Sequence, residues 1–180
     1  MEKFEFDDEI YYYIKNNSEQ YFVDSNWTKL DNATQQKVGT AYFSFMHIEE
    51  MNAVELTQYI KDVKTCGLYG LTKNACIYGL KKFGTIAQFV YNIMPVLTST
   101  CRIMHRPQEA IDYAQQYLPA CGSVALFTSL AGAYCDVKDY TNAKKFADRA
   151  YAMQGGGKGY MNELSLVYQR IQKETKETLY

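Results

Sequence analysis

The sequence has few of the features that mark membrane, secreted or disulfide-stabilised proteins. No stretch approaches the roughly 20 consecutive apolar residues that a transmembrane helix needs, and the acidic N-terminus lacks the basic start and apolar run of a secretory signal. The five cysteines are odd in number and include no Cys-x-x-Cys spacing, so we expect free thiols. These absences predict a cytoplasmic protein with no membrane association.

Residues that commonly carry catalysis or bind metals are also scarce. His47 and His105 are the only histidines, and His105 follows Cys101 by four residues, which places both on one predicted helix face. A metal site needs further ligands, and a Cys–His nucleophile pair needs an orienting acid. The glycine-rich segment 155–159 follows a predicted helix, and its Lys158 is not followed by Ser or Thr, so it does not fit a phosphate-binding loop. We therefore predict a non-enzymatic protein without a cofactor or metal.

Tyrosine is abundant, and charge is unevenly distributed. The chain has 17 tyrosines, whose rings pack between helices while their hydroxyls still reach water or a partner. The net charge is −1, but residues 1–60 hold 11 acidic against 4 basic residues and residues 61–180 hold 9 against 15. The acidic segment can dock on the basic remainder within one fold, or the basic part can meet an acidic partner. The acidic, aromatic N-terminus is also compatible with self-association into a homo-oligomer.

Helical periodicity predominates from about residue 27 onward, and no convincing run of strict alternation predicts a strand. Only 3 prolines occur, and the glycines cluster at expected helix ends. Residues 9–16 can form a short helix or an extended arm. We expect an all-α fold in which residues 1–60 form an acidic, aromatic-rich helical segment packed on the helices of residues 61–180.

One segment combines large and small residues at regular helical spacings. Large residues recur along its first expected helix at Phe127, Leu130 and Tyr134. Small residues that allow two helices to approach closely lie in that helix and the next, at Ala131, Ala143, Ala147 and Ala150. Asp139 stands between the two helices, where its side chain can cap the second one.

This pattern resembles one tetratricopeptide repeat, a helix pair that recurs about every 34 residues. A weaker copy precedes it, with Met94, Leu97 and Cys101 in its first helix. Downstream, Leu164 and Tyr168 repeat the first-helix pattern, but no second helix follows, as in a terminal capping helix. The resemblance covers residues 91–172 and implies a short α-solenoid of antiparallel helix pairs with an N-terminal helical extension.

The resemblance also implies a concave face, built from the first helix of each pair, that binds a protein or peptide partner. The candidate contact residues on this face are Thr128, Ser129, Gly132 and Asn162. The inward positions of the central repeat offer no charged side chain for gripping a C-terminal carboxylate, so a more neutral surface is expected. A protein-binding adaptor is therefore the predicted function.

The second helix of the same repeat offers an alternative. Lys144, Lys145 and Arg149 are expected to lie near one another on its outer side, and with the interleaved tyrosines they can form a nucleic-acid surface. A solvated polar face explains the same pattern, because every amphipathic helix has one. Nucleic-acid binding is the less favoured hypothesis.

Overall fold

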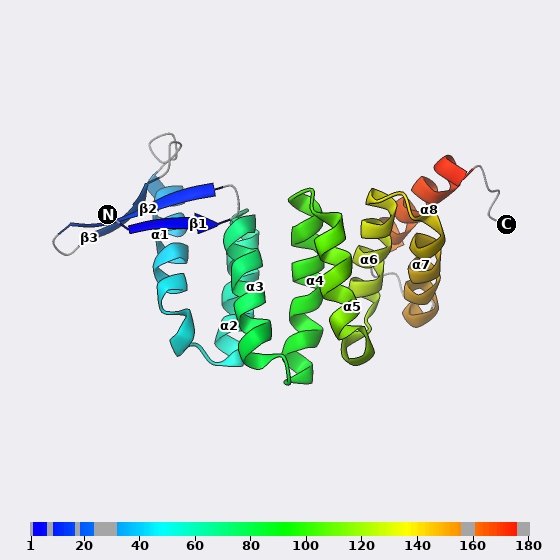
Figure 1. Cartoon of the computed structure of the whole chain (residues 1–180), viewed down its shortest axis with the longest axis horizontal. Helices are drawn as coiled ribbons and strands as arrows, with labels where there is room; N and C mark the ends of the chain where they lie inside the picture. Colours follow the sequence, from blue (N-terminus) through cyan, green and yellow to red (C-terminus); the bar gives the residue numbers. More distant parts are fainter. Residues whose placement is uncertain (1, 7–8, 17–18, 24–31, 156–160, 176–180) are drawn as a thin grey trace. The chain divides into compact units, whose positions relative to one another are not determined.

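The chain forms two compact units, residues 1–83 and 84–180, which are described separately (Figure 1). The boundary follows helix α3 (Tyr69–Phe83), whereas the predicted boundary after residue 60 falls inside helix α2 (Ala53–Thr65). In the described part of the chain, no helix has the length and apolar character needed to cross a membrane. This computed structural model describes residues 2–6, 9–16, 19–23, 32–155 and 161–175.

The N-terminal unit opens with strands where a helical segment was predicted. They form one antiparallel sheet in the order β1-β2-β3, with bounds Glu2–Phe6, Glu9–Asn16 and Glu19–Val23. In β2 the residues Ile-Tyr-Tyr-Tyr-Ile do not alternate between apolar and polar, so periodicity gives no strand signal. Aromatic and β-branched residues nevertheless favour extended backbone. The prediction of helix over residues 1–60 is therefore wrong for this segment, although an extended conformation had been considered for residues 9–16.

The rest of the N-terminal unit is helical: α1 (Asn32–Met46), the short 3-10 helix η2 (Ile48–Glu50), α2 and α3. Asn52 begins α2 with a capping box, in which its side chain accepts from the Glu55 N–H while the Glu55 carboxylate accepts from the Asn52 N–H. The buried Tyr42, Val63 and Leu71 join α1, α2 and α3 in one core cluster.

The C-terminal unit consists of helices, which confirms the predicted all-α class for this part of the chain. Helix α6 contacts all four of its neighbours in this unit, and ten consecutive residues of it, 126–135, are buried. Such all-round burial explains why most residues of α6 are apolar or small and why the helix has no broad charged face. The bounds are α4 Ala87–Ile103, α5 Pro107–Cys121, α6 Val124–Asp136, α7 Tyr140–Gln154 and α8 Met161–Thr175.

Three helix-to-helix turns share one hydrogen-bond pattern. In each turn, the N–H that follows a residue with positive φ donates to the carbonyl five residues earlier, which ends the helix as a Schellman motif. The residues with positive φ are Gly67 after α2 (77°), His105 after α4 (58°) and Lys138 after α6 (64°). Glycine adopts this conformation freely, whereas His and Lys adopt it at a cost.

Replacing Lys138 with glycine is expected to raise the free energy of unfolding by about 0.5–1 kcal/mol, because it removes the steric cost of a side chain at positive φ. The matched control is Lys145→Gly in the helical interior of α7, which should lower the same free energy by about 1 kcal/mol. Urea denaturation followed by circular dichroism measures both. Two losses of similar size would contradict the role assigned to the turn.

Candidate partner-binding face

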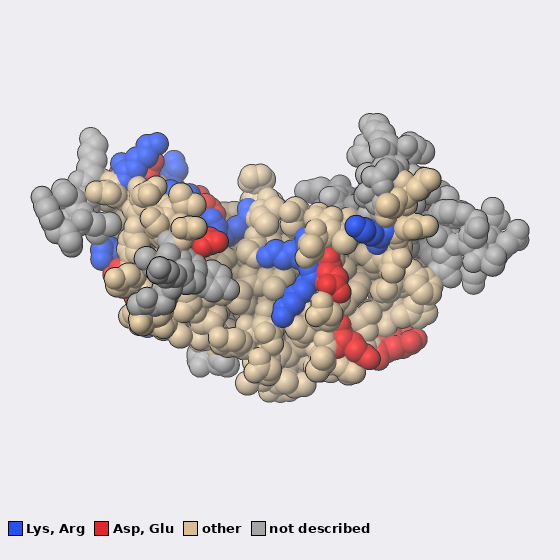
Figure 2. Space-filling model, turned by 180° about the vertical axis from the view of Figure 1, so that it is seen from behind, with Lys and Arg blue, Asp and Glu red and all other residues tan. Residues whose placement is uncertain are grey.

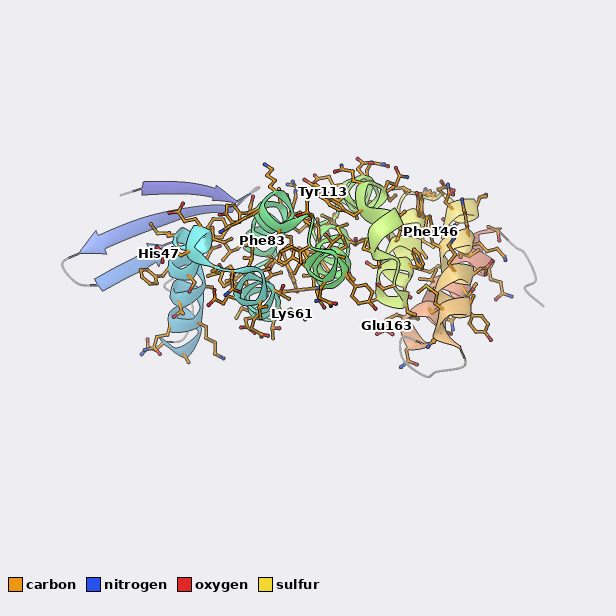
Figure 3. All side chains as sticks on the ribbon, turned by 90° about the horizontal axis from the view of Figure 1, so that it is seen from below. His47, Lys61, Phe83, Tyr113, Phe146 and Glu163 are labelled. Atoms are coloured by element: carbon orange, nitrogen blue, oxygen red, sulfur yellow. The ribbon has the colours of Figure 1, made fainter. Side chains whose placement is uncertain are left out.

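The candidate site lies on one side of α6, between α4 and α8, both of which contact α6. On its opposite side, α6 packs on α7: the Phe146 ring of α7 lies 5.8 Å from the Phe127 ring and 5.4 Å from the Tyr134 ring, between centroids. Figure 3 labels Phe146 where α7 faces α6. At 3.6 residues per turn, the side of α6 that is turned away from α7 carries small residues, and an acidic residue lies on the same side at the end of the helix. We call the small residues Ala125, Thr128, Ser129 and Gly132 the α6 strip.

Three of the four predicted contact residues belong to the α6 strip and are buried. Thr128 is 5% exposed and Ser129 is 8% exposed, and Gly132 is also buried. Within the described part of the chain, neither hydroxyl has a hydrogen-bond partner. Asn162, the fourth predicted residue, is exposed on α8. The side chains of Thr128 and Ser129 are therefore not accessible to a partner, and the backbone at Gly132 is covered as well.

A single carboxylate, that of Asp136 at the end of α6, holds two arginines from the flanking helices. Arg102 of α4 donates from Nε to Oδ2 of Asp136 at 2.8 Å, and Nη2 of Arg170 on α8 lies 2.8 Å from Oδ1. We call this group the arginine bridge. All three side chains are partly exposed. Each guanidinium has five N–H donors, so the bridge leaves donors of both arginines free for other acceptors.

Gly132 allows the arginine bridge to lie directly on α6. A Cβ atom at this position would collide with the guanidinium carbon and both terminal nitrogens of Arg102. The Arg102 side chain therefore rests on the backbone of α6 while it reaches Asp136. Sequence reasoning selected Gly132 but did not predict the ion pairs of the arginine bridge. Their spacing was an available signal, because Arg102, Asp136 and Arg170 follow one another at 34-residue intervals, the expected repeat length.

Exposed apolar side chains lie within one helical turn of both arginines along α4 and α8. Ile103, 45% exposed, follows Arg102 at the end of α4. Leu166, 59% exposed, lies one helical turn before Arg170 on α8. The face thus combines apolar and cationic groups, which is the composition typical of a protein-interaction surface.

One of the three basic residues predicted as an alternative nucleic-acid surface, Lys144, is paired with an acid of its own helix. Lys144 Nζ lies 2.9 Å from Oδ2 of Asp148, whose other oxygen accepts a 2.7 Å hydrogen bond from the Tyr168 hydroxyl. Burial raises the pKa of Asp148, but the hydrogen bonds from Lys144 and Tyr168 outweigh it, so this pKa lies below its usual value. The carboxylate therefore stays charged at neutral pH and offsets the lysine.

Arg149 is engaged differently, through aromatic rings. Its guanidinium lies over the Phe127 and Phe146 rings, at 5.8 and 5.6 Å from their centroids. Lys145 is exposed. On the face that Figure 2 draws, Lys and Arg side chains lie next to Asp and Glu side chains. Of the three predicted residues, Lys144 is paired with a carboxylate, whereas Lys145 and Arg149 are exposed.

In the part of the chain that the structure describes, no group of three or more His, Cys, Asp or Glu side chains is placed to hold a metal ion. No protein-family model matches the sequence, and no curated protein matches it.

Proposed function

We propose that the C-terminal unit is a tetratricopeptide-like interaction module, and that it binds a peptide segment of a protein partner over α4, α6 and α8. The observation that carries this proposal is the composition of that face. Exposed Ile103 and Leu166 lie within one helical turn of the two arginines along their helices, and the α6 residues turned away from α7 are small. Apolar contacts can supply affinity, and the free guanidinium donors can fix the orientation of the bound segment.

The repeated turns support the architecture that this function requires. The Schellman turns at His105 and Lys138 are 33 residues apart, close to the length of one repeat. Each connects two helices that pack on one another, α4 with α5 and α6 with α7. Successive helix pairs then place α4 and α6 side by side, as their contacts require.

Close packing within the central pair supports the same architecture. Three small residues of α7 are completely buried: Ala143, Ala147 and Ala150. They recur at three- and four-residue spacing, which makes one smooth helix face that α6 can approach closely. Their burial supports the proposed close pairing of α6 and α7.

Helix α8 supports the assignment of a capping helix. Leu164, Val167 and Ile171 are buried where it packs on α6 and α7. The exposed residues of α8 are mostly polar, namely Asn162, Glu163, Ser165, Gln169 and Gln172. A terminal helix of a repeat stack needs such a polar outer side.

The experiment selects binders to the full-length chain from a phage library of random peptides and titrates a selected, fluorescently labelled peptide by anisotropy. Leu166→Arg is expected to weaken its binding by about tenfold or more, because it places a third cation where an apolar contact forms. Met153→Arg, at an equally exposed apolar position on α7, should leave affinity unchanged. Equal affinity for all three proteins, or failure to select any peptide, would contradict the proposed face. Both positions are exposed, so neither variant is expected to impair folding.

A further inference from the structure

The arginine bridge spans the α6 strip from both sides. Arg102 comes from α4 and Arg170 from α8, and both converge on the carboxylate of Asp136. On its way, the Arg102 guanidinium covers the backbone at Gly132. The protein's own side chains therefore cover α6 at Gly132, where a partner on this face would otherwise contact the helix.

About one helical turn before this covered position, α6 carries buried hydroxyls with unused hydrogen-bonding capacity. Ser129 is 8% exposed, and its hydroxyl has no hydrogen-bond partner among the described residues; the same is true of Thr128 at 5%. Ser129 lies one helical turn before Gly132 and two turns before Asp136, which places all three on the same side of α6. A buried hydroxyl without a partner is costly, and a bound peptide could satisfy it through its main-chain groups.

The arginine bridge is also a contact that can open at small cost. Its three side chains are partly exposed to water, and ion pairs of this kind contribute little to stability individually and are weakened by salt. Both guanidiniums end flexible side chains, so they can move without displacing a helix. The surrounding core of α6, by contrast, is fully buried.

We propose that the arginine bridge is a strap that closes the α6 strip in the free protein and opens to admit the main chain of a bound peptide segment. This inference rests on the proposed function of the α4, α6 and α8 face, because it describes the same surface before and after binding. The closed state lowers apparent affinity by the fraction of molecules that are open. Weakening the strap therefore exposes the α6 strip and strengthens peptide binding.

Thiol labelling measures the opening without any partner. Ser129→Cys is placed in full-length protein that also carries Cys66→Ser, since Cys66 is the exposed cysteine among the five. Labelling with N-ethylmaleimide is followed by peptide mass spectrometry. Asp136→Asn removes the charge that holds both arginines, and Gly132→Ala displaces the Arg102 guanidinium by a different route. Each of these two substitutions is expected to raise the labelling rate at position 129 about tenfold. Added salt should also raise this rate in the protein that keeps Asp136, because salt weakens the ion pairs.

Two controls separate opening of the strap from general loosening. Asp148→Asn removes the Lys144 ion pair on α7 and should leave labelling at position 129 unchanged. Cys101 is fully buried on α4, and its labelling in the same samples should stay slow throughout. Unchanged labelling at position 129 in both Asp136→Asn and Gly132→Ala would overturn the strap. A parallel rise at Cys101 would overturn it as well, because it would show unfolding.

Affinity for the selected peptide tests the link to function. In the native-serine background, Asp136→Asn should bind this peptide about threefold or more tightly than wild type. Faster labelling combined with weaker or unchanged binding would contradict admission of a peptide beneath the strap. If no peptide is selected by the wild-type protein, the proposed function fails, while the labelling result still decides whether the bridge opens and closes.

Discussion

Replacing Leu130 with alanine is expected to lower the free energy of unfolding by about 3 kcal/mol. Leu130 lies in the middle of α6 and is fully buried. Because α6 contacts α4, α5, α7 and α8, the neighbours cannot collapse onto the site without disturbing several interfaces. The loss therefore includes both the transfer free energy of the removed methyl groups and the cost of the remaining cavity.

Leu166→Ala is the matched control, because the same atoms are removed from a side chain that is 59% exposed on α8. Its free energy of unfolding should change by no more than about 0.5 kcal/mol. Urea denaturation of the full-length chain, monitored by far-ultraviolet circular dichroism, compares the two variants. Similar losses at both positions would contradict a packed central position for α6.

Replacing Ala147 with leucine is expected to lower the free energy of unfolding by about 2 kcal/mol. Ala147 is fully buried in α7, which packs on α6 and α8. Three additional carbon atoms at this position force α7 away from a neighbouring helix or push neighbouring side chains out of their preferred rotamers. The substitution favours helix locally as much as alanine does, so the loss reports packing and not helix propensity.

Ala152→Leu provides the control for Ala147→Leu within the same helix. Ala152 is exposed, so the added atoms meet water and not α6. Thermal denaturation should show a lower midpoint for Ala147→Leu alone. A neutral or stabilising effect of Ala147→Leu would mean that α6 and α7 leave a space at this position, contrary to close packing of the central pair.

Helix positions in the C-terminal unit followed from local signals. Ser and Asp are residue types that favour helix caps, and the side chains of Ser123 and Asp139 accept hydrogen bonds from the N–H groups of Leu126 and Asn142. Proline is favoured in the first turn of a helix, and Pro107 begins α5. Such signals act between residues a few positions apart, so they can be read without knowledge of the fold.

Pro95 shows where local rules left alternatives open. A proline can either lie within a helix and kink it or begin a new helix, and the structure places Pro95 inside the continuous helix α4. The N-terminal strands show a different limit, because β2 has a continuous apolar centre without alternation. Pairing with β1 and β3 decides its conformation, and strand pairing is not a property of β2 alone.

The sequence by itself determined the helices of residues 84–180, their caps and the pattern of large and small residues that brings α6 and α7 together. Tertiary structure decided the candidate site. It buried Thr128 and Ser129, and it joined Arg102 and Arg170 through Asp136 across three helices. The physical reason is the sequence separation of the interacting residues. Caps and helix periodicity depend on neighbours within about one turn. An ion pair between residues 34 positions apart forms only after packing has set which helices lie side by side.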